Sequence, residues 1–468
     1  MKFTKIDVSK QSILTQILKK YPLVQDIVHA LDAVGGKVVL VGGAVRDLLL
    51  GLPVKDLDIE VHNLLPEQVE DILCTFGPVS LIGKSFGVFR VHKLDVDWSL
   101  PRTDTHGRKP HVAIDPFMGF VQAFRRRDLT INAMGIDLIT YELIDPFHGQ
   151  QDLRNKILRE TDAELFVQDP LRFYRVMQFI SRFNMVPAES LNVICMHMDI
   201  KNISVERIEA EFNKLMLKSQ RPSLGIRWIQ AIGRLHTVLP ELHALVGVEQ
   251  GADWHPEGDV FEHTMQTLDA SVATVYTNQF DTLVLRYAAL CHDLGKATHT
   301  QKIDGKIWSH GHDKAGDALT RNMLKRITRN KELIDAVCKL VSHHMAPLQF
   351  VENGAKKSAY KRLANKLAPQ VTMGMLADLA LADRRGRNPD SQEPLVNPQP
   401  EVEEFRARAQ QAHVLTQIEQ PILQGADLLD SVQAGPRMGQ LLREAYEIQL
   451  EEGIKDKDEL KRRILSKK

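Results

Sequence analysis

Two aspartates stand one residue apart in the segment DLDIEVHN (56–63), where acidic and apolar residues alternate. In a β-strand, residues i and i+2 share a face, so Asp56 and Asp58 point the same way while the apolar residues between them point inward. Adjacent carboxylates repel each other unless cations neutralise them, and a pair of Mg²⁺ ions both does this and serves nucleotidyl transfer. A neighbouring strand usually supplies a third carboxylate. Asp97 is our candidate for it, and Asp95, which shares its face, is an alternative.

A glycine pair lies just upstream of these aspartates, in the segment LVGGAVRDLLLG (40–51). A turn formed by Gly42 and Gly43 before a helix lets backbone N–H groups approach a triphosphate closely. The spacing is neither that of a Walker A loop nor that of G-x-G-x-x-G. An acidic strand alone would more simply be solvated surface. The glycine turn, the VRD triplet and the two aspartates together favour a nucleotide site over that interpretation.

A second group of metal-binding residue types follows further along the chain, because several of the 18 histidines cluster with aspartates. They occur in HPEGDVFEHTM (255–265), ALCHDLGK (289–296), SHGHDKAG (309–316), LVSHHMAP (340–347) and LALADRRGR (379–387). Imidazole and carboxylate groups together suit a first-row transition metal or Mg²⁺. A single histidine is more often a core or surface residue with satisfied hydrogen bonds. The number and order of these residues favour a metal site.

The elements that must position these residues fall into two parts. Up to about residue 150 the pattern is mixed, with a helix over 1–35, strands at 37–43, 56–63 and 87–100, and a short helix at 44–51 that ends in glycine. From about 150 to 390 almost only helical periodicity occurs, followed by a proline-rich linker at 387–404 and a helical tail. The first helix has an apolar stripe formed by Ile13, Ile17, Leu18, Val24, Ile27 and Leu31.

The segment VGGAVRDLLLGLPVKDLDIEV (41–61) resembles the catalytic core of class II tRNA nucleotidyltransferases and related bacterial poly(A) polymerases. Later segments resemble further motifs of these enzymes: RRDLTINAM (126–134), LIDPFHGQQDLRNKILR (143–159) with His148 where a glycine is common, QDPLRFYRVMQFISRF (168–183) and SVERIEAEFNKLM (204–216). The resemblance covers roughly half the chain. It implies template-independent addition of C, C and A to the 3′ end of tRNA from CTP and ATP, with release of pyrophosphate.

The same resemblance implies roles for individual residues. Asp56 and Asp58 would hold Mg²⁺, and Asp97 would complete the catalytic set. Nucleotide contacts would come from Gly42, Gly43, Arg46, Asp47, Arg127, Asp128, Asn132, Asp169, Arg172, Arg175 and Arg207. Of these, Asp169 and Arg172 would read the base, because acceptors and donors together can mimic a Watson–Crick partner. The family motif usually begins with Glu, and Gln168 replaces it here, which removes a charge beside the base-reading pair.

The order His, His-Asp, His, His, Asp resembles the HD superfamily of metal phosphohydrolases. This resemblance implies a site for a divalent metal of unspecified identity, with the ligands His263, His292, Asp293, His312, His343 and Asp383. Four of them, His263, His292, Asp293 and Asp383, would hold one metal, and the other two would allow a second. In related enzymes such domains carry 2′,3′-cyclic phosphodiesterase, 2′-nucleotidase and phosphatase activity. Repair of tRNA ends would then be an accessory function.

Composition adds further limits. The 468 residues include equal numbers of basic and acidic residues, so binding to RNA would rely on local patches. The four cysteines form no CxxC pair and no apolar run approaches 18 residues, so we expect a cytoplasmic protein without a membrane partner. The basic candidates for RNA contacts are Arg102, Arg108, Lys109 and 125–127, and, in an acid-free stretch, Lys356, Lys357, Lys361, Arg362 and Lys366.

We therefore expect an α+β protein, with a small mixed α/β nucleotidyltransferase head followed by an all-α neck, HD domain and tail. The expected segments are an N-terminal helical extension (1–35), the catalytic head (36–155), a helical neck with the nucleotide-selecting motif (156–245), the HD domain (246–388), and a linker with a helical tail (389–468). Two alternatives stay open. One is a poly(A) polymerase or a partial enzyme that adds only CC or only A, although SVERIEAEF favours the CCA type. The other is an HD phosphohydrolase whose head only binds RNA.

Overall fold

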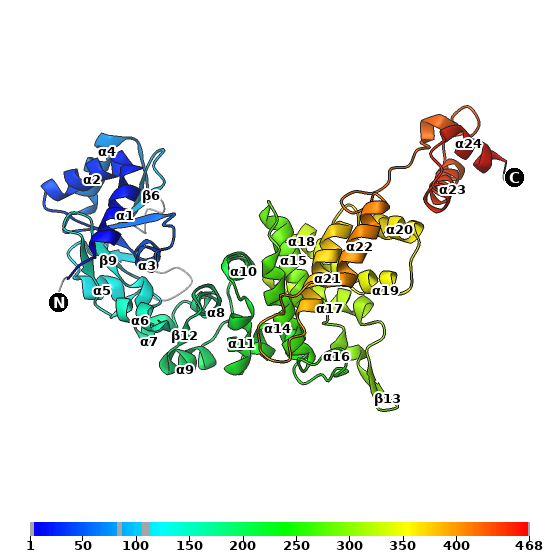
Figure 1. The fold of residues 1–468 in the computed structure, drawn as a ribbon. Coiled ribbons are helices and arrows are strands. Elements are labelled where there is room, and N and C mark those ends of the chain that lie inside the picture. The colour runs from blue at the N-terminus through cyan, green and yellow to red at the C-terminus, as the bar shows by residue number, and fades with distance from the viewer. Residues whose placement is uncertain (1–3, 82–86, 105–111, 467–468) are drawn as a thin grey trace. The chain divides into compact units, whose positions relative to one another are not determined.

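The computed structural model describes residues 4–81, 87–104 and 112–466. The chain forms two compact units, Met1–Ile203 and Ser204–Lys468. Strands and helices mix in the first unit, and helices predominate in the second (Figure 1). No helix of these described residues is long and apolar enough to cross a membrane. The expected α+β class, a mixed head followed by helical regions, is confirmed.

The first unit is built on an eight-stranded sheet in the order β1-β10-β9-β2-β3-β6-β5-β4. Neighbouring strands run antiparallel, except that β3 and β6 run parallel. The central position of β2 explains why its β-branched residues are buried. The strands are β1 (Thr4–Lys5), β2 (Lys37–Val41), β3 (Leu57–His62), β4 (Val79–Leu81), β5 (Val88–Val91), β6 (Val96–Ser99), β9 (Gly135–Asp137) and β10 (Glu142–Ile144), with a separate pair β7 (Arg102–Asp104) and β8 (Val112–Ile114).

The N-terminal region contains two helices, where the sequence predicted one. Helix α1 (Val8–Lys19) ends before Tyr21, and α2 (Pro22–Ala33) begins at a proline, which fits the first turn of a helix but not its interior. The break also changes which residues face inward. Leu14 is fully buried, whereas Ile13, expected in the apolar stripe, is 41% exposed.

The segment 87–100 also differs from the expectation of one long strand. It forms two strands, β5 and β6, which pair antiparallel as a hairpin. The chain reverses at Lys93, whose φ of 68° is in the left-handed region. This conformation is unusual for a residue that is not glycine. The reversal brings β6 alongside β3.

The remaining helices of the first unit lie between the strands of the sheet in sequence, or after the last of them. The short glycine-capped helix expected at 44–51 is present as α3 (Gly43–Leu50), and Gly51 closes it with a φ of 73°. Helix α8 (Leu171–Phe183) contains most of the segment 168–183, which the sequence predicted to select the nucleotide. The other helical segments are α4 (Pro66–Phe76), α5 (Phe120–Arg125), the 3₁₀ turn η1 (Thr130–Asn132), α6 (Gly149–Asn155), α7 (Ala163–Phe166) and α9 (Glu189–His197). A small parallel pair of strands, β11 (Ile157–Leu158) and β12 (Val186–Pro187), lies among them in the sequence.

The second unit is a helical assembly with one hairpin that the sequence did not predict. Its core comes from apolar faces of α14, α15, α18 and α21, which pack against one another. Its elements up to residue 385 are α10 (Val205–Lys218), α11 (Ser223–Ala231), α12 (Leu235–Val238), α13 (Pro240–His243), α14 (Val260–Ala270), η2 (Ser271–Ala273), α15 (Gln279–Cys291), α16 (Lys296–His299), the hairpin β13 (Gln301–Ile303) and β14 (Lys306–Trp308), α17 (His312–Ile327), α18 (Lys331–Val341), α19 (Ala346–Glu352), α20 (Lys357–Leu367) and α21 (Met373–Arg385).

The expected linker at 387–404 is attached to the helices before it. The backbone N–H of Asn388 donates to the side chain of Gln266 at 2.9 Å, and Arg221 pairs with Glu393 at 3.1 Å. Helix α22 begins at Pro400 and packs on α19 and α21. The tail after it has a small core of its own, which includes Leu423 and Ile464. The elements are α22 (Pro400–Gln411), η3 (Gly425–Leu428), α23 (Pro436–Glu452) and α24 (Lys457–Leu465).

Candidate functional site

The carboxylates predicted on the strand face lie together in the first unit. Asp58 on β3 is the register partner of Asp97 on β6, and Asp56 immediately precedes β3. The protein around the Asp58 carboxyl withdraws water from it, and the negative charges of Asp97 and Asp56 add to this, so its pKa is raised despite the nearby Arg127. Carboxylates this close together repel one another, and a bound cation would relieve that repulsion.

Asp97 is held by a neighbour on the next strand. Arg90 on β5 binds one oxygen of Asp97 through Nε at 2.8 Å and Nη2 at 2.6 Å. Asp95 is 87% exposed, and its carboxylate lies 3.7 Å from the same guanidinium. Asp97 therefore has both the register and the support to act with Asp58.

The glycine turn lies beside these carboxylates. Gly42 has a φ of 70°, and a Cβ built there would approach Nη1 of Arg127 to 2.9 Å and Oδ2 of Asp58 to 4.0 Å. Glycine is required because a side chain would be strained at this φ and would collide with the guanidinium. The turn thus brings the start of α3, an arginine and a carboxylate predicted to be catalytic into one small region. Gly43 begins α3 directly behind it.

A buried glutamate anchors the arginines of this region, and the sequence reasoning missed it. The Glu60 side chain is fully buried. It accepts from His62 at 3.0 Å and lies 3.5 Å from both Arg126 and Arg127. Burial would raise the Glu60 pKa, but His62 and the arginines outweigh it, so the pKa is lowered. The signal was present, because residue 60 continues the i, i+2 series of Asp56 and Asp58.

Five residues expected to contact the nucleotide are hydrogen-bonded to one another in a network, in the order Asp47, Arg46, Asn132, Asp128 and Arg175. Arg46 is buried, donates to Asp47 at 2.9 Å and to Asn132 at 2.5 Å, and lies over the rings of Phe179 and Phe183 on α8. Asn132 donates to Asp128 at 2.9 Å, and Arg175 on α8 binds the other Asp128 oxygen at 2.6 Å.

Asp128 is the electrostatic centre of this network. Burial alone would raise the Asp128 pKa, but Arg175, Asn132 and Arg172 outweigh it and hold the pKa at about 2. The carboxylate is therefore ionised at any physiological pH. These hydrogen bonds connect α3, η1 and α8, so the residues that form them fix the geometry around the glycine turn.

The predicted base-reading pair lies at the start of α8. Arg172 donates to the backbone carbonyls of Leu165 at 2.8 Å and Arg126 at 2.6 Å, which fixes the direction of its guanidinium. One oxygen of Asp169 accepts from the N–H of Leu171 at 3.2 Å. The remaining predicted contact, Arg207, lies on α10 in the second unit.

The histidine and aspartate cluster of the second unit is buried and divides into two groups that share Asp293. In the first group, Nε2 of His263 lies 3.2 Å from Nε2 of His292, 3.2 Å from Asp383 and 3.6 Å from Asp293. The second group consists of Asp293, His312 and His344. Asp293 faces the first group through Oδ2 and the second through Oδ1.

The second group corrects one predicted ligand. Nε2 of His344 lies 3.1 Å from Nε2 of His312 and 3.7 Å from Asp293. His343 is only half-buried, and its Nδ1 lies 3.0 Å from the carbonyl of Lys339, in the last turn of α18. The two histidines follow the last residue of α18, so they point in different directions. His344, not His343, therefore belongs to the cluster.

These donor sets fit divalent metals. Ligand atoms that bind at about 2.0–2.2 Å in tetrahedral geometry are about 3.3–3.6 Å apart, close to the separations in both groups. Each histidine also has its Nδ1 near an oxygen acceptor, which directs the lone pair of Nε2 into the cluster. The Nδ1 acceptors are the carbonyls of Gly386 for His263, Ala289 for His292, Ser309 for His312 and Val341 for His344.

The surroundings of the cluster shift the pKa values of its members in different directions. Burial alone would raise the pKa of Asp293, but His292, Lys296 and His312 outweigh it and hold the pKa well below its usual value. Burial lowers the pKa of His344 to about 3, with repulsion from His312 and His292. Burial would also lower the pKa of His263 and His312, but hydrogen bonds to Asp383 and to Asp293 outweigh it and raise both. A metal requires neutral imidazole, so its binding to these two histidines would release protons.

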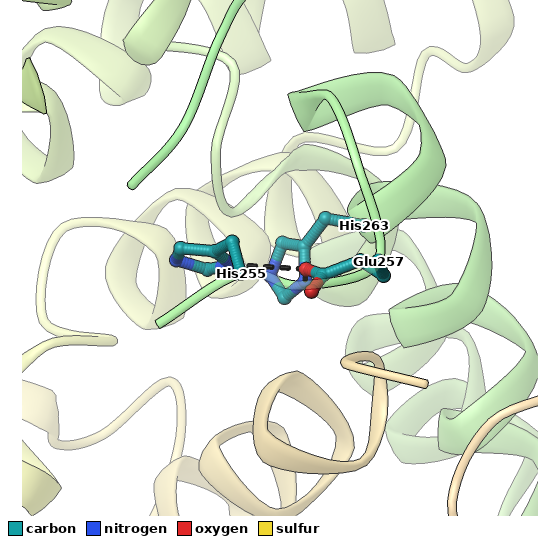
Figure 2. Close-up of side chains that lie close together, drawn as sticks. All are labelled: His255, Glu257 and His263. Carbon is teal, nitrogen blue, oxygen red and sulfur yellow. Dashed lines mark hydrogen bonds and ion pairs between the residues drawn. The ribbon is translucent and has the colours of Figure 1, made fainter. Parts of the chain in front are cut away.

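A second feature absent from the predicted ligand set is Glu257, which lies in the loop before α14. Figure 2 shows its carboxylate beside the His263 ring, with a dashed line toward the His255 ring. One oxygen accepts from Nδ1 of His263 at 2.7 Å and from Nδ1 of His255 at 2.9 Å. Burial opposes ionisation of Glu257, but these two hydrogen bonds outweigh it and hold the pKa at about 2. His263 is thus oriented by a charged acceptor.

Comparisons with known proteins match both units to known families. Residues 38–159 match the family model of the poly A polymerase head domain, and 260–367 match the HD domain. Residues 188–246 match a family described as the probable RNA and SrmB-binding site of polymerase A. The multifunctional CCA protein of Mannheimia succiniciproducens is 35% identical over 366 residues, which cover 74% of this chain and 84% of that protein. The corresponding Laribacter hongkongensis protein is 38% identical, covering 66% and 74%.

The chain belongs to the multifunctional CCA protein family. Solved structures of CCA-adding enzymes share its fold. One in complex with CTP has a TM-score of 0.64 at 17% identity and covers 100% of this chain and 99% of that chain. The Bacillus stearothermophilus enzyme with CTP has a TM-score of 0.63 at 22% identity, covering 95% and 97%. The predicted family is confirmed, whereas the five segment boundaries and the residue roles stay predictions.

Several basic residues predicted to contact RNA already pair with acidic groups. On α20, Lys361 pairs with Glu419 at 2.5 Å, and Arg362 pairs with Glu447 at 3.0 Å and with Glu451 at 2.5 Å. The acid-free stretch thus faces acids from the C-terminal tail. In the head, Arg125 pairs with Asp162, and Arg108 and Lys109 lie outside the described residues.

Proposed function

We propose that this protein adds C, C and A, one nucleotide at a time, to the 3′ end of tRNA, using CTP and ATP. The observation that carries the proposal is the pairing of Asp58 with Asp97 beside the Gly42 turn, in a chain of the multifunctional CCA protein family. In each addition, the 3′ hydroxyl oxygen of the RNA bonds to the α-phosphorus, and the bond from that phosphorus to pyrophosphate breaks.

Each part of the head site has a distinct task in this reaction. Asp56 and Asp58 would hold Mg²⁺, with Asp97 beside them, and the ion when bound supplies charge neutralisation for the attacking and leaving oxygens. The N–H of Gly42 donates to the carbonyl of Met134 at 3.2 Å, so the backbone N–H groups offered to the triphosphate would be those at the start of α3, from Gly43 onward. Arg127 lies beside the Gly42 turn and is positioned by Glu60, so it would neutralise phosphate charge. The hydrogen bonds that connect Asp47 to Arg175 through Arg46, Asn132 and Asp128 would hold these parts in place.

Choice of nucleotide would rest on Asp169 and Arg172 at the start of α8. The two carbonyls that accept from Arg172 leave its guanidinium in one orientation, as a base-reading group requires. Gln168, which replaces the usual glutamate, is exposed. We expect the replacement to be tolerated, because an exposed charge contributes little to the orientation of Arg172.

The test is incorporation of labelled CTP and ATP, separately and together, into tRNA that lacks its 3′ CCA, with Mg²⁺ present. Addition of two C and one A, and no more, is the expected result. Incorporation of only C or only A would make this a partial enzyme, and long A tails would make it a poly(A) polymerase. Asp58→Asn should abolish incorporation, whereas Glu67→Gln, an exposed acid on α4, should not.

For the second unit we propose a metal-dependent phosphohydrolase that acts on phosphate esters of the 2′,3′-cyclic or terminal type. His263, His292, Asp293 and Asp383 would hold one divalent metal, and His312 and His344 with Asp293 a second. A metal held there supplies Lewis-acid polarisation of the phosphate. Asp293→Asn should abolish release of phosphate or opening of the cyclic ester while leaving CCA addition intact. Asp58→Asn should do the reverse, and loss of both activities in one variant would contradict two separate sites.

A further inference from the structure

The hairpin β13–β14 is attached at its base to the histidine cluster. It ends at Trp308, one residue before Ser309, whose carbonyl oxygen lies 2.6 Å from Nδ1 of His312. The hydroxyl of Ser309 also bonds that of Thr300, just before β13, at 2.8 Å. The hairpin therefore begins and ends beside a proposed metal ligand.

One face of this hairpin combines an aromatic ring, an aliphatic side chain and an amine. The register pairs Gln301 with Trp308 and Ile303 with Lys306, which places these four side chains on the same face. Trp308 is 44% exposed and Ile303 is 48% exposed. Lys302 lies on the opposite face, where its register partner is Ile307.

The Trp308 ring is already part of a stack. The His310 ring lies 5.1 Å from it, centroid to centroid, at an interplanar angle of 18°. Exposed hydrophobic side chains are common singly, but here two lie on one face of a short hairpin with a parallel imidazole. Stacked planar rings with a neighbouring amine are the combination that binds a nucleobase and its phosphate.

We propose that this hairpin face is a stacking subsite for the nucleobase at the 3′ end of an RNA whose terminal phosphate ester enters the histidine cluster. The base would stack against Trp308, with Ile303 covering its edge and Lys306 meeting the adjoining backbone phosphate. The inference rests on the proposed phosphohydrolase function of the second unit. It adds that the unit selects nucleotide esters over other phosphate esters.

The full-length protein loaded with a divalent metal tests this with two substrates. One is adenosine 2′,3′-cyclic phosphate, and the other is the same cyclic phosphate on a methyl riboside that lacks the base. Trp308→Ala should raise the KM for the nucleotide by roughly 5- to 100-fold, the range that loss of one base–aromatic stack implies, with kcat unchanged. The baseless substrate should be unaffected, and Trp308→Phe should restore most of the nucleotide KM.

The two lysines of the hairpin give a matched control. On a short RNA that ends in the cyclic phosphate, Lys306→Ala should raise KM and weaken its dependence on salt, and Lys302→Ala should do neither. Equal effects of Trp308→Ala on both substrates, or none on either, would overturn the subsite. If the wild-type protein hydrolyses neither substrate, the phosphohydrolase proposal fails. Direct titration with the same RNA then decides the subsite: binding that Trp308→Ala weakens supports it, and equal binding overturns it.

Discussion

Replacement of Glu257 by Gln tests whether a buried carboxylate sets the affinity of the second unit for metal. The substitution keeps the shape of the side chain but removes the charge that accepts from Nδ1 of His263 at 2.7 Å. Loss of such an acceptor typically weakens metal binding by about 10- to 100-fold. We expect the lower end, roughly tenfold or about 1.4 kcal/mol, because the carbonyl of Gly386, at 3.1 Å, still accepts from the same nitrogen.

The measurement is calorimetric titration of the metal-free protein with Co²⁺, in an Asp58→Asn background that removes the head site. Glu262→Gln is the matched control, because Glu262 binds Arg227 with both oxygens, at 2.5 and 2.9 Å, and lies outside the cluster. The Glu262→Gln substitution should lower the free energy of unfolding without changing the affinity for metal. Unchanged affinity in Glu257→Gln, or an equal loss in both variants, would refute the positioning role of Glu257.

Three further predictions concern other parts of the two sites. His344→Ala should remove bound metal from the second group whereas His343→Ala should not, and elemental analysis of the two purified proteins compares them. Asp128→Asn should destabilise the first unit by on the order of 2 kcal/mol at neutral pH. Because the folded pKa of about 2 lies below the ordinary 3.8, this stability is present above about pH 4 and is lost as the pH falls towards 2, so the variant and the parent should converge there. Unfolding in urea, followed by the ¹⁹F resonance of labelled Trp98, the single tryptophan of residues 1–203, measures it. Gly42→Ala should cost on the order of 1–3 kcal/mol by the same measurement, because a φ of 70° with a ψ of −131° is a conformation that residues other than glycine rarely adopt, and it should abolish nucleotide incorporation. Normal activity in that variant would show that the turn does not bind the triphosphate.

The head site could be predicted well because its decisive relations are local or follow from strand geometry. The alternation of a strand predicted that Asp56 and Asp58 share a face, and the structure has Asp58 on β3 and Asp56 directly before it. The partnership of Asp58 with Asp97 additionally needs β6 to run parallel to β3. That arrangement depends on a reversal at Lys93, a residue that gives no turn signal in the sequence. The predicted long strand over 87–100 was wrong for the same reason.

The histidine cluster shows where sequence reasoning stops. His343 and His344 follow the end of α18, so helical periodicity does not say which of them faces the core. Glu257 lies in a loop, where Gly258 with a φ of 129° turns the chain, and its partners lie on other segments. Contacts of this kind depend on tertiary packing. The hairpin β13–β14 was missed because its strands have only three residues each.

The chain of hydrogen bonds from Asp47 to Arg175 constrains how this protein can evolve. Asp128 and Arg175 are separated by 47 positions in sequence, and each is the charged partner of the other. Loss of either removes an ionic hydrogen bond from a buried or half-buried charge, so single substitutions should be removed by selection. Neutral drift can then pass through this region only by paired replacements. Among homologues, positions 46, 128, 132 and 175 should vary together or not at all. Such covariation would indicate from sequences alone that α3 and α8 are in contact through these residues.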